Sequence, residues 1–203
     1  LDGELSSAFG NMAALRSVSI HLNKFTGTIP AAFGNLPQLY SLNLNGNNLE
    51  GGIPPSLGNL TQLEFLSLHH NSLSGAVPSQ ITQCRKLATI VLEHNQLTGL
   101  PDLTSIDSLR ELDVHDNRLT FEDIEPNIGI PGVIYSPQAM LGRMHDTTLT
   151  EGGSIIFSVT AGGSANRYQW MKDWNDIPGA QSAAYAISQI TPADEGSYVC
   201  EVT

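Results

Sequence analysis

The sequence predicts a solenoid of stacked coils with a parallel sheet, followed by a separate all-β sandwich. Three observations lead to this prediction. A short segment with the pattern LxxLxLxxNxL recurs at nearly constant spacing over the first 120 residues. The period then stops after Thr120. The rest of the chain alternates short apolar strands with turns rich in Gly, Asn and Asp.

Five copies of the repeated pattern start at residues 15, 39, 63, 87 and 109, so the spacing is 24 residues three times and then 22. Within each copy apolar residues alternate with polar ones, as in a strand with one buried face. In the third copy Leu66 and Leu68 should point to the core, while Phe65, Ser67 and His69 should point outward. One coil cannot bury its apolar face alone, so we expect the coils to stack around a shared core.

The residues that follow each strand also recur. An asparagine in each copy should bond to backbone groups that the turn leaves unpaired: Asn23, Asn47, Asn71, Asn95 and Asn117. Glycines four residues later suit a close backbone approach: Gly27, Gly51, Gly75 and Gly99. Prolines then stop ladder pairing and direct the chain into the return: Pro30, Pro54, Pro78 and Pro101. Cys84 lies on that return and is expected to be a small core residue.

These motifs resemble the leucine-rich repeat, in the LxGxIP subtype of plant receptor ectodomains. "FTGTIP" (25–30), "LEGGIP" (49–54) and "LSGAVP" (73–78) carry the subtype. The resemblance implies a leucine-rich repeat solenoid with an irregular or 3-10 convex side over residues 1–133. The segment "FEDIEPNIGIPGVIYSPQ" (121–138) has no helical stripe and is expected to cover the last coil and then connect to the next domain.

Residues 134–203 resemble an immunoglobulin-like domain. Trp170 in "YQWMKD" and Tyr198 in "DEGSYVC" match the strand-C tryptophan and the tyrosine corner of that fold. Val159 stands where the strand-B cysteine is usual, so the resemblance implies no intersheet disulfide. The fold also expects a final strand after Thr203, so the domain is predicted to be C-terminally truncated. Leucine-rich repeats joined to such a domain resemble bacterial cell-surface proteins.

The charge of the chain excludes several classes of partner. The formal net charge is −11 and the sequence pI about 4.7, with an acidic excess in both parts of the chain. Nucleic acid and anionic lipid need a concentrated basic surface, so neither is expected as a partner. No apolar run approaches the ~18 residues of a membrane span, so no direct membrane insertion is expected.

Catalysis is not expected either. The sequence contains no P-loop, GxGxxG, GxSxG or HExxH motif. An open strand face supplies no evident pocket or oxyanion donors for acid pairs such as Glu111 and Asp113. We therefore expect a non-enzymatic protein without a cofactor.

Histidines recur on the outward side of the predicted sheet. One row of equivalent residues across the coils consists of His21, Asn45, His69, Glu93 and His115, and the row beside it consists of Leu22, Gly46, His70, His94 and Asp116. Two imidazoles and a carboxylate are residue types that zinc uses. Strands ~4.8 Å apart, however, separate His69 and His115 by about 10 Å at the backbone, so no metal site is predicted. A second hypothesis is that the histidines near Glu93, Asp113 and Asp116 make ligand binding pH-sensitive.

The function expected from these features is recognition of a protein ligand on the concave repeat face, as a cell-surface or secreted adhesion module. The candidate contact residues are Phe65, Ser67, His69, Thr89, Val91, Glu93, Glu111, Asp113 and His115. Phe65 and Val91 are the expected apolar anchors, and the acidic end favours a basic partner segment.

Two alternatives stay open: a carbohydrate-binding accessory module of a surface or degradative protein, and a structural spacer. Sugar sites favour aromatic platforms, and only 6% of the chain is aromatic, which favours a protein ligand. Trp174, in the "DWND" turn, could anchor a partner or stack on a sugar, but packing against its own hairpin or the repeat domain is favoured.

Overall fold

The computed structural model describes residues 1–136, 138, 147–163 and 166–202. It divides the chain into two units, Leu1–Leu141 and Gly142–Thr203. The repeat copies all lie in the first unit, and the strand-and-turn segment forms the second. No helix formed by the described residues is long and apolar enough to cross a bilayer.

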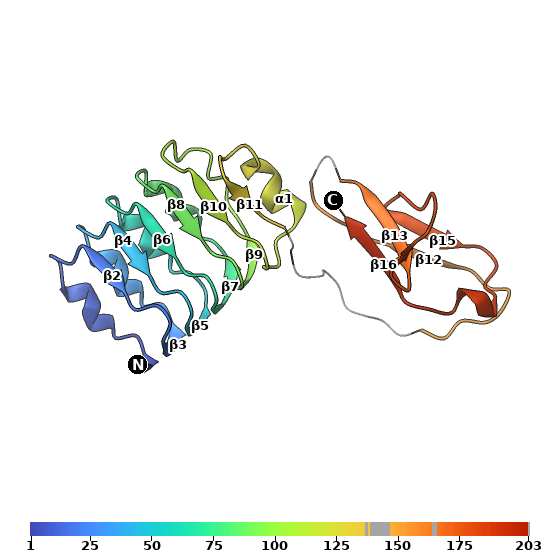
Figure 1. The fold of residues 1–203 in the computed structure, drawn as a ribbon, viewed down its shortest axis with the longest axis horizontal. Helices are drawn as coiled ribbons and strands as arrows, with labels where there is room; N and C mark the ends of the chain where they lie inside the picture. The colour runs from blue at the N-terminus through green and yellow to red at the C-terminus, as the bar shows by residue number, and fades with distance from the viewer. Residues whose placement is uncertain (137, 139–146, 164–165, 203) are drawn as a thin grey trace. The chain divides into compact units, whose positions relative to one another are not determined.

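Each coil of the first unit contributes one short strand to a six-stranded parallel sheet (Figure 1). Its strands, in spatial order, are β11 (Val133–Ile134), β10 (Glu111–Asp113), β8 (Thr89–Val91), β6 (Phe65–Ser67), β4 (Ser41–Asn43) and β2 (Ser17–Ser19). The apolar residue in the middle of each repeat strand pairs in register with the next one and is buried: Val18, Leu42, Leu66, Ile90 and Leu112. This confirms the alignment of the copies. The sheet continues to Ile134, one residue past the boundary expected from the sequence.

The same coils also form a second parallel sheet, which the sequence analysis did not predict. Its strands, in spatial order, are β1 (Asp2–Glu4), β3 (Lys24–Thr28), β5 (Asn48–Gly51), β7 (Ser72–Ala76) and β9 (Gln96–Gly99). Gly27 and Gly75 lie in these strands with φ of 74°. A left-handed backbone favours glycine because a Cβ would be strained there, so these glycines permit the local bend.

The return sides of four coils are 3-10 turns, within the irregular or 3-10 convex side that the resemblance implied, and the return over residues 102–108 has no 3-10 turn. The turns are η1 (Ser7–Asn11), η2 (Ala31–Asn35), η3 (Pro55–Asn59) and η4 (Ser79–Gln83). Close backbone approach occurs here: a Cβ on Gly34 would lie 2.2 Å from the Ser56 carbonyl oxygen, and one on Gly58 would lie 2.3 Å from that of Gln80. A Cβ on Gly51 or Gly75 would meet no backbone atom within 4 Å, whereas one on Gly99 would lie 3.5 Å from the Ala76 Cα, so the expected close backbone approach was wrong for Gly51 and Gly75.

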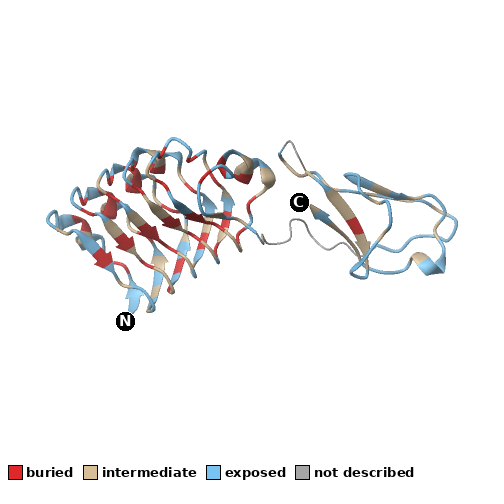
Figure 2. Cartoon of the chain, turned by 45° about the horizontal axis from the view of Figure 1, so that its top comes forward, coloured by how far each residue is buried: buried red, intermediate tan, exposed pale blue. Residues whose placement is uncertain are grey.

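The core of the first unit is one continuous cluster of buried residues, mostly leucine and isoleucine, and Figure 2 colours the buried positions of the ribbon red. The asparagines border it as expected. Asn95 donates from Nδ2 to the carbonyl oxygens of Leu68, Leu92 and Glu93, and its Oδ1 accepts from the Leu73 N–H. Each amide thus ties one coil to its neighbour. Cys84 is also fully buried, and burial raises the pKa of its thiol to about 11.

Two short helices follow the last coil where no helix was expected. α1 (Phe121–Ile124) begins with a capping box, in which Thr120 and Asp123 each bond to the other's backbone N–H, and η5 (Glu125–Asn127) continues it. A four-residue helix is too short to show an apolar stripe, so the sequence pattern missed it. Ile124 and Ile130 are buried against the repeat core, which agrees with the expected cover; residue 137 of that segment lies outside the described residues.

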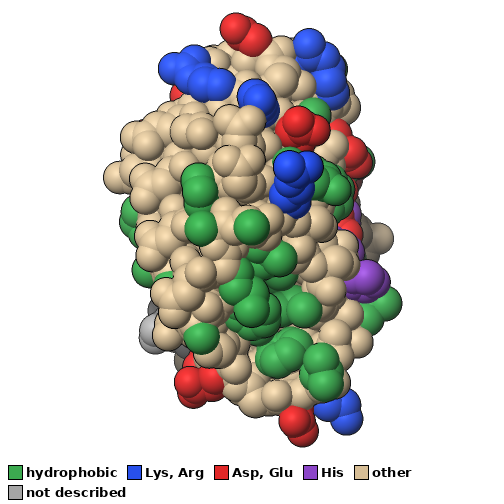
Figure 3. Space-filling model, turned by 90° about the vertical axis from the view of Figure 1, so that its left-hand side faces the viewer, with side chains coloured by type: hydrophobic (Ala, Val, Ile, Leu, Met, Phe, Trp, Pro, Cys, Tyr) green, Lys and Arg blue, Asp and Glu red, His purple; other side chains and the backbone are tan. Residues whose placement is uncertain are grey.

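Figure 3 views the end of the first unit at which the chain begins, where hydrophobic side chains gather. Leu1, Met12 and Leu22 are among the exposed large hydrophobic residues of the chain. Stacked coils leave such an end because each coil depends on a neighbour to cover its apolar face.

The second unit consists of two small antiparallel sheets. One pairs β12 (Ile155–Ser158) with β15 (Ala184–Ile187), and the other has the order β14 (Asn175–Asp176), β13 (Tyr168–Lys172), β16 (Tyr198–Val202). The turn η6 (Pro192–Asp194) precedes β16.

Four aromatic rings join the two sheets of the second unit. The Phe157 ring centroid lies 4.7 Å from that of Tyr198 and 6.0 Å from that of Trp170, and Tyr185 lies 6.3 Å from Trp170. Trp170 is buried and donates from Nε1 to the Ser182 carbonyl oxygen at 2.9 Å. These rings hold the sheets face to face.

Candidate functional site

The nine candidate residues form a grid of three rows and three coils on one side of the β2–β11 sheet. We call this side, opposite the buried middle residues, the open sheet face. Its rows are Phe65–Thr89–Glu111, Ser67–Val91–Asp113 and His69–Glu93–His115. The third row lies beyond the strand ends, and backbone hydrogen bonds keep it in register. The Leu68 N–H donates to the Val91 carbonyl oxygen, and the Leu92 N–H donates to the Asp113 carbonyl oxygen. The structure therefore brings together all nine residues that the sequence selected.

The grid is less exposed than the sequence suggested. Ser67 is only 1% exposed and Asp113 8%, so the expectation that both offer free outward side chains was wrong. Both lie in the middle row, where longer neighbours stand on either side, and Ser67 Oγ also accepts from Asn45 Nδ2 at 3.3 Å. Phe65 and Val91 are half-buried, and Glu111 is exposed.

The row of residues that follows the third row has a backbone feature that sequence reasoning missed. Its five residues all have left-handed φ values between 50° and 62°: Leu22, Gly46, His70, His94 and Asp116. Non-glycine residues rarely adopt this region. The glycine at position 46 was the available signal, because it shows that the repeat places a positive φ directly before each asparagine. This turn aims His70, His94 and Asp116 back toward the grid.

The result is a dense group of imidazoles and carboxylates, which we call the histidine cluster. It consists of His69, His70, Glu93, His94, Asp113, His115 and Asp116. Successive rings from His69 through His70 and His94 to His115 have centroids 5.1, 4.2 and 5.2 Å apart, all edge to face. His69 Nδ1 lies 3.3 Å from Glu93 Oε1, and His115 Nδ1 lies 2.5 Å from Asp113 Oδ1.

The ionisable groups of the histidine cluster shift one another's pKa values. Burial, and then the hydrogen bond and charge of Asp113, raise the pKa of Glu93 to about 7. Burial, followed by repulsion from the next histidine, lowers the pKa of His69 and of His70. Burial also lowers the pKa of His115, but the hydrogen bond that its ring N–H donates to Asp113 and the charges of the nearby carboxylates outweigh it, so the net shift is upward. The cluster therefore changes its charge near neutral pH.

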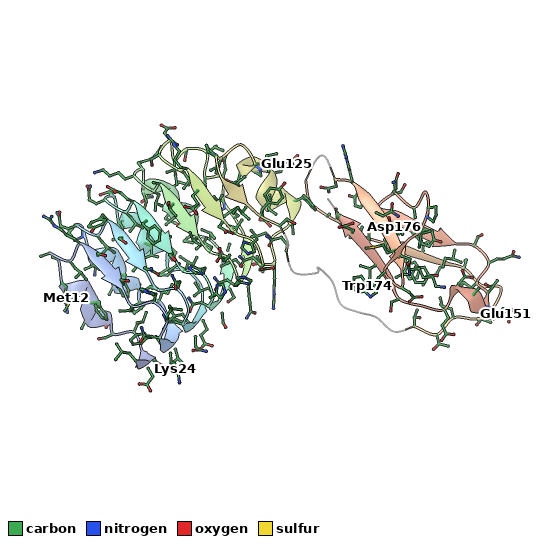
Figure 4. All side chains as sticks on the ribbon, in the orientation of Figure 1. Met12, Lys24, Glu125, Glu151, Trp174 and Asp176 are labelled. Atoms are coloured by element: carbon green, nitrogen blue, oxygen red, sulfur yellow. The ribbon has the colours of Figure 1, made fainter. Side chains whose placement is uncertain are left out.

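Trp174 lies outside this face, in the two-residue turn between β13 and β14 (Figure 4). Its side chain is 70% exposed, so the expectation that it packs against its own hairpin was wrong. Asp173 and Trp174 both have positive φ, as a type I′ hairpin turn requires. A bulky residue at such a position is strained, and the turn directs the indole outward.

A comparison with protein families identifies the repeats. The family model described as leucine rich repeat matches residues 6–49 and 61–119, which together make up half of the chain. No curated protein matches the chain.

Solved structures with the same fold come from plants and from a bacterium. The Arabidopsis receptor kinase HAESA ectodomain, solved with an IDA peptide hormone, is 35% identical over 66% of this chain and 24% of its own, with a TM-score of 0.59. The Arabidopsis GASSHO1/SCHENGEN3 ectodomain, solved with CASPARIAN STRIP INTEGRITY FACTOR 2, is 29% identical over 68% of this chain and 17% of its own, with a TM-score of 0.63. A leucine-rich repeat protein of Leptospira interrogans is 30% identical over 64% of this chain and 34% of its own, with a TM-score of 0.58. The chain thus spans about a third or less of each of these structures.

Proposed function

This chain belongs to the leucine-rich repeat family, and from that premise we propose that its first unit is a non-enzymatic recognition module that binds a protein or peptide on the open sheet face. The observation that carries the proposal is the grid of nine side chains held in register on one side of the sheet. The peptide complexes of HAESA and GASSHO1/SCHENGEN3 support it, because those proteins share the fold of this unit.

The face offers two kinds of contact to such a ligand. Phe65 and Val91 lie on adjacent strands in neighbouring rows and supply the apolar surface of the grid, with Val91 at its centre and Phe65 at one corner. Glu93 and Glu111 add carboxylates toward the later coils, whereas Asp113 is buried beneath its neighbours. Apolar anchors ringed by charge are typical of binding hot spots, and the carboxylates favour a basic peptide segment.

The proposal extends to the whole chain as follows. The repeats are of the LxGxIP subtype, and the second unit forms an immunoglobulin-like domain that serves as a spacer or a second contact. The buried Trp170 supports this, as does the Tyr198 hydroxyl, which donates to the Asp194 carbonyl oxygen at 2.9 Å, the contact expected of a tyrosine corner. Such a protein would act outside the cell or on its surface in adhesion, as in bacterial surface proteins.

A peptide display library selected on the immobilised chain tests the recognition proposal. Selected peptides should bind the wild type and lose at least about tenfold in affinity to the Phe65→Ala, Val91→Ser double variant. Ile128→Ser, which changes an exposed apolar side chain outside these strands, is the matched control and should bind normally. Circular dichroism checks that each variant is folded. Peptides that bind the double variant as well as the wild type would place recognition elsewhere.

Carbohydrate binding remains the second candidate because Trp174 is exposed at a hairpin tip. An indole face held out by a turn is a platform on which a sugar ring can stack. A polysaccharide panel probed with wild type and Trp174→Ala separates the two functions. Binding to a glycan that is lost in Trp174→Ala and unaffected by the Phe65/Val91 changes would move function to the second unit.

A further inference from the structure

Four of the six histidines of the chain lie in the histidine cluster. The cluster occupies the third row of the open sheet face and the later residues of the left-handed row beside it, together with Asp113 from the second row. Within it, two separate groups each place three potential ligand atoms within 4.8 Å of one another without sharing a residue: His69, His70, Glu93 and His94, His115, Asp116.

The first group has the dimensions of a metal site. The Nδ1 atoms of His69 and His70 are 3.0 Å apart, and Glu93 Oε1 lies 3.3 Å from the first and 3.9 Å from the second. A tetrahedral zinc ion with bonds of about 2.0–2.1 Å separates its ligand atoms by about 3.3 Å. The three atoms therefore form nearly one face of a coordination tetrahedron, and small side-chain rotations would complete the fit.

The fold explains why these atoms converge. Adjacent residues of a strand point to opposite sides, but the left-handed φ of 53° at His70 turns its ring toward that of His69. Glu93 comes from the next coil, held there by the bond from the His70 N–H to the Glu93 carbonyl oxygen at 3.0 Å. The side chains of His69 and Glu93 are 25% and 17% exposed, whereas that of His70 is 54% exposed. Two ligands are thus held by packing while the site stays open to solvent.

From this geometry we propose that His69, His70 and Glu93 bind a divalent transition-metal ion of the zinc type. Imidazole suits zinc, copper and nickel, whereas calcium and magnesium prefer all-oxygen sites. Three protein ligands leave one coordination position open, as in zinc sites that bind a further molecule. The sequence argument against a metal site used the distance between His69 and His115, which lie in one row. In the structure His69 and Glu93 come from that row and His70 comes from the row beside it.

A second position rests on a different observation. His94 Nδ1 and His115 Nε2 lie 3.2 and 3.4 Å from Asp116 Oδ2, and the other ring nitrogen of His115 is bonded to the buried Asp113. Metal-ligating histidines usually donate their second ring N–H to a carboxylate, which orients the ring. Asp113 is thereby a positioning residue for a second ion at His94, His115 and Asp116.

Calorimetric titration of the chain with Zn²⁺, together with the visible absorption of bound Co²⁺, tests the proposal without any protein or peptide partner. The test is therefore independent of the proposed ligand binding. We expect two ions with micromolar or tighter affinity and no heat with Mg²⁺. His70→Asn, in which Asn tolerates the left-handed backbone, should remove one ion, and Glu93→Gln should weaken the same ion at least about tenfold. His94→Asn should remove the other ion.

His21→Asn is the matched control. His21 occupies the same row in the first coil but bonds to Ser19 Oγ, outside the cluster, so this variant should bind as the wild type does. Absence of Zn²⁺ and Co²⁺ binding below about 1 mM, or equal weakening in His21→Asn and His70→Asn, would overturn the proposal. One ion that is lost in His70→Asn and kept in His94→Asn would overturn the second position alone. Thermal unfolding with EDTA verifies that each variant is folded.

Discussion

The two units of the chain keep their apolar side chains from water in different ways. In the first unit every coil adds leucines at the same positions, and most of them are fully buried because the next coil covers them. In the second unit, Trp170 is the only buried residue among those that the structure describes. The other three rings that join its two sheets, Phe157, Tyr185 and Tyr198, are only half-buried.

The difference shows what stacking does for a chain. A solenoid spreads its stability over many equivalent interfaces between neighbouring coils, so the loss of one contact leaves the others in place. A small sandwich has one core, and its stability is concentrated there. We therefore expect the two units to respond differently to single substitutions.

The largest effect is expected for Trp170→Ala. Removing a buried Trp costs about 3–5 kcal/mol, which approaches the whole stability of a small domain. The second unit should lose its protected amides in hydrogen exchange while the first keeps them. Trp174→Ala, at an exposed position, should change stability by less than about 0.5 kcal/mol. A second unit that stays protected in Trp170→Ala would show that its stability does not depend on this aromatic group.

A smaller effect is expected for Asn95→Ala in the first unit. The change leaves the Leu73 N–H without its acceptor and removes one of the two amide donors to the Leu68 carbonyl oxygen, which keeps Asn71 Nδ2, at a cost of about 1–3 kcal/mol. Because the other coils keep their contacts, the unit should stay folded with a lower midpoint in urea. The control is Asn48→Ala, an exposed asparagine, whose midpoint should match the wild type. Equal urea midpoints for both variants would show that the hydrogen bonds of Asn95 do not contribute measurably to the stability of the first unit.

The smallest effect is the pH dependence due to Glu93. Its pKa is raised from 4.5 to about 7, so the folded unit binds more protons than the unfolded chain between these values. Stability should therefore be fully present below about pH 4.5 and fall as the pH rises toward 7. The charged groups that share this titration are His69, His70, Asp113, His115 and Asp116.

Urea unfolding in the presence of EDTA, from about pH 5 to about pH 7.5, measures this dependence. Relative to Glu93→Gln, which stays neutral, the wild type should lose about 1 kcal/mol over this range, less than the full shift because neighbouring groups share the proton. The exposed Glu111→Gln should follow the wild type. Parallel curves for wild type and Glu93→Gln would mean that Glu93 titrates as an ordinary surface carboxyl.

Much of the candidate face could be read from the sequence. The alignment of the five copies placed Phe65, Thr89 and Glu111 in one row, and the pairing of the strands agrees. A repeat of fixed length requires equivalent residues to stack, so register follows from spacing alone. Burial did not follow in the same way: Ser67 and Asp113 face outward yet are covered, because exposure depends on the size of neighbours from other coils.

By itself, the sequence determined the coil period, the leucine core, the hydrogen-bonding asparagine that follows each strand, and the rows of the open sheet face. These follow from local alternation repeated at a constant interval. Only the tertiary structure decided that a second sheet forms, that Trp174 points outward, and that His70 and His94 turn toward the grid. Those features depend on backbone angles and on contacts between neighbouring coils, which the residue types alone do not specify. The histidine cluster, and with it the proposed metal positions, exists because stacking brings together side chains from three coils.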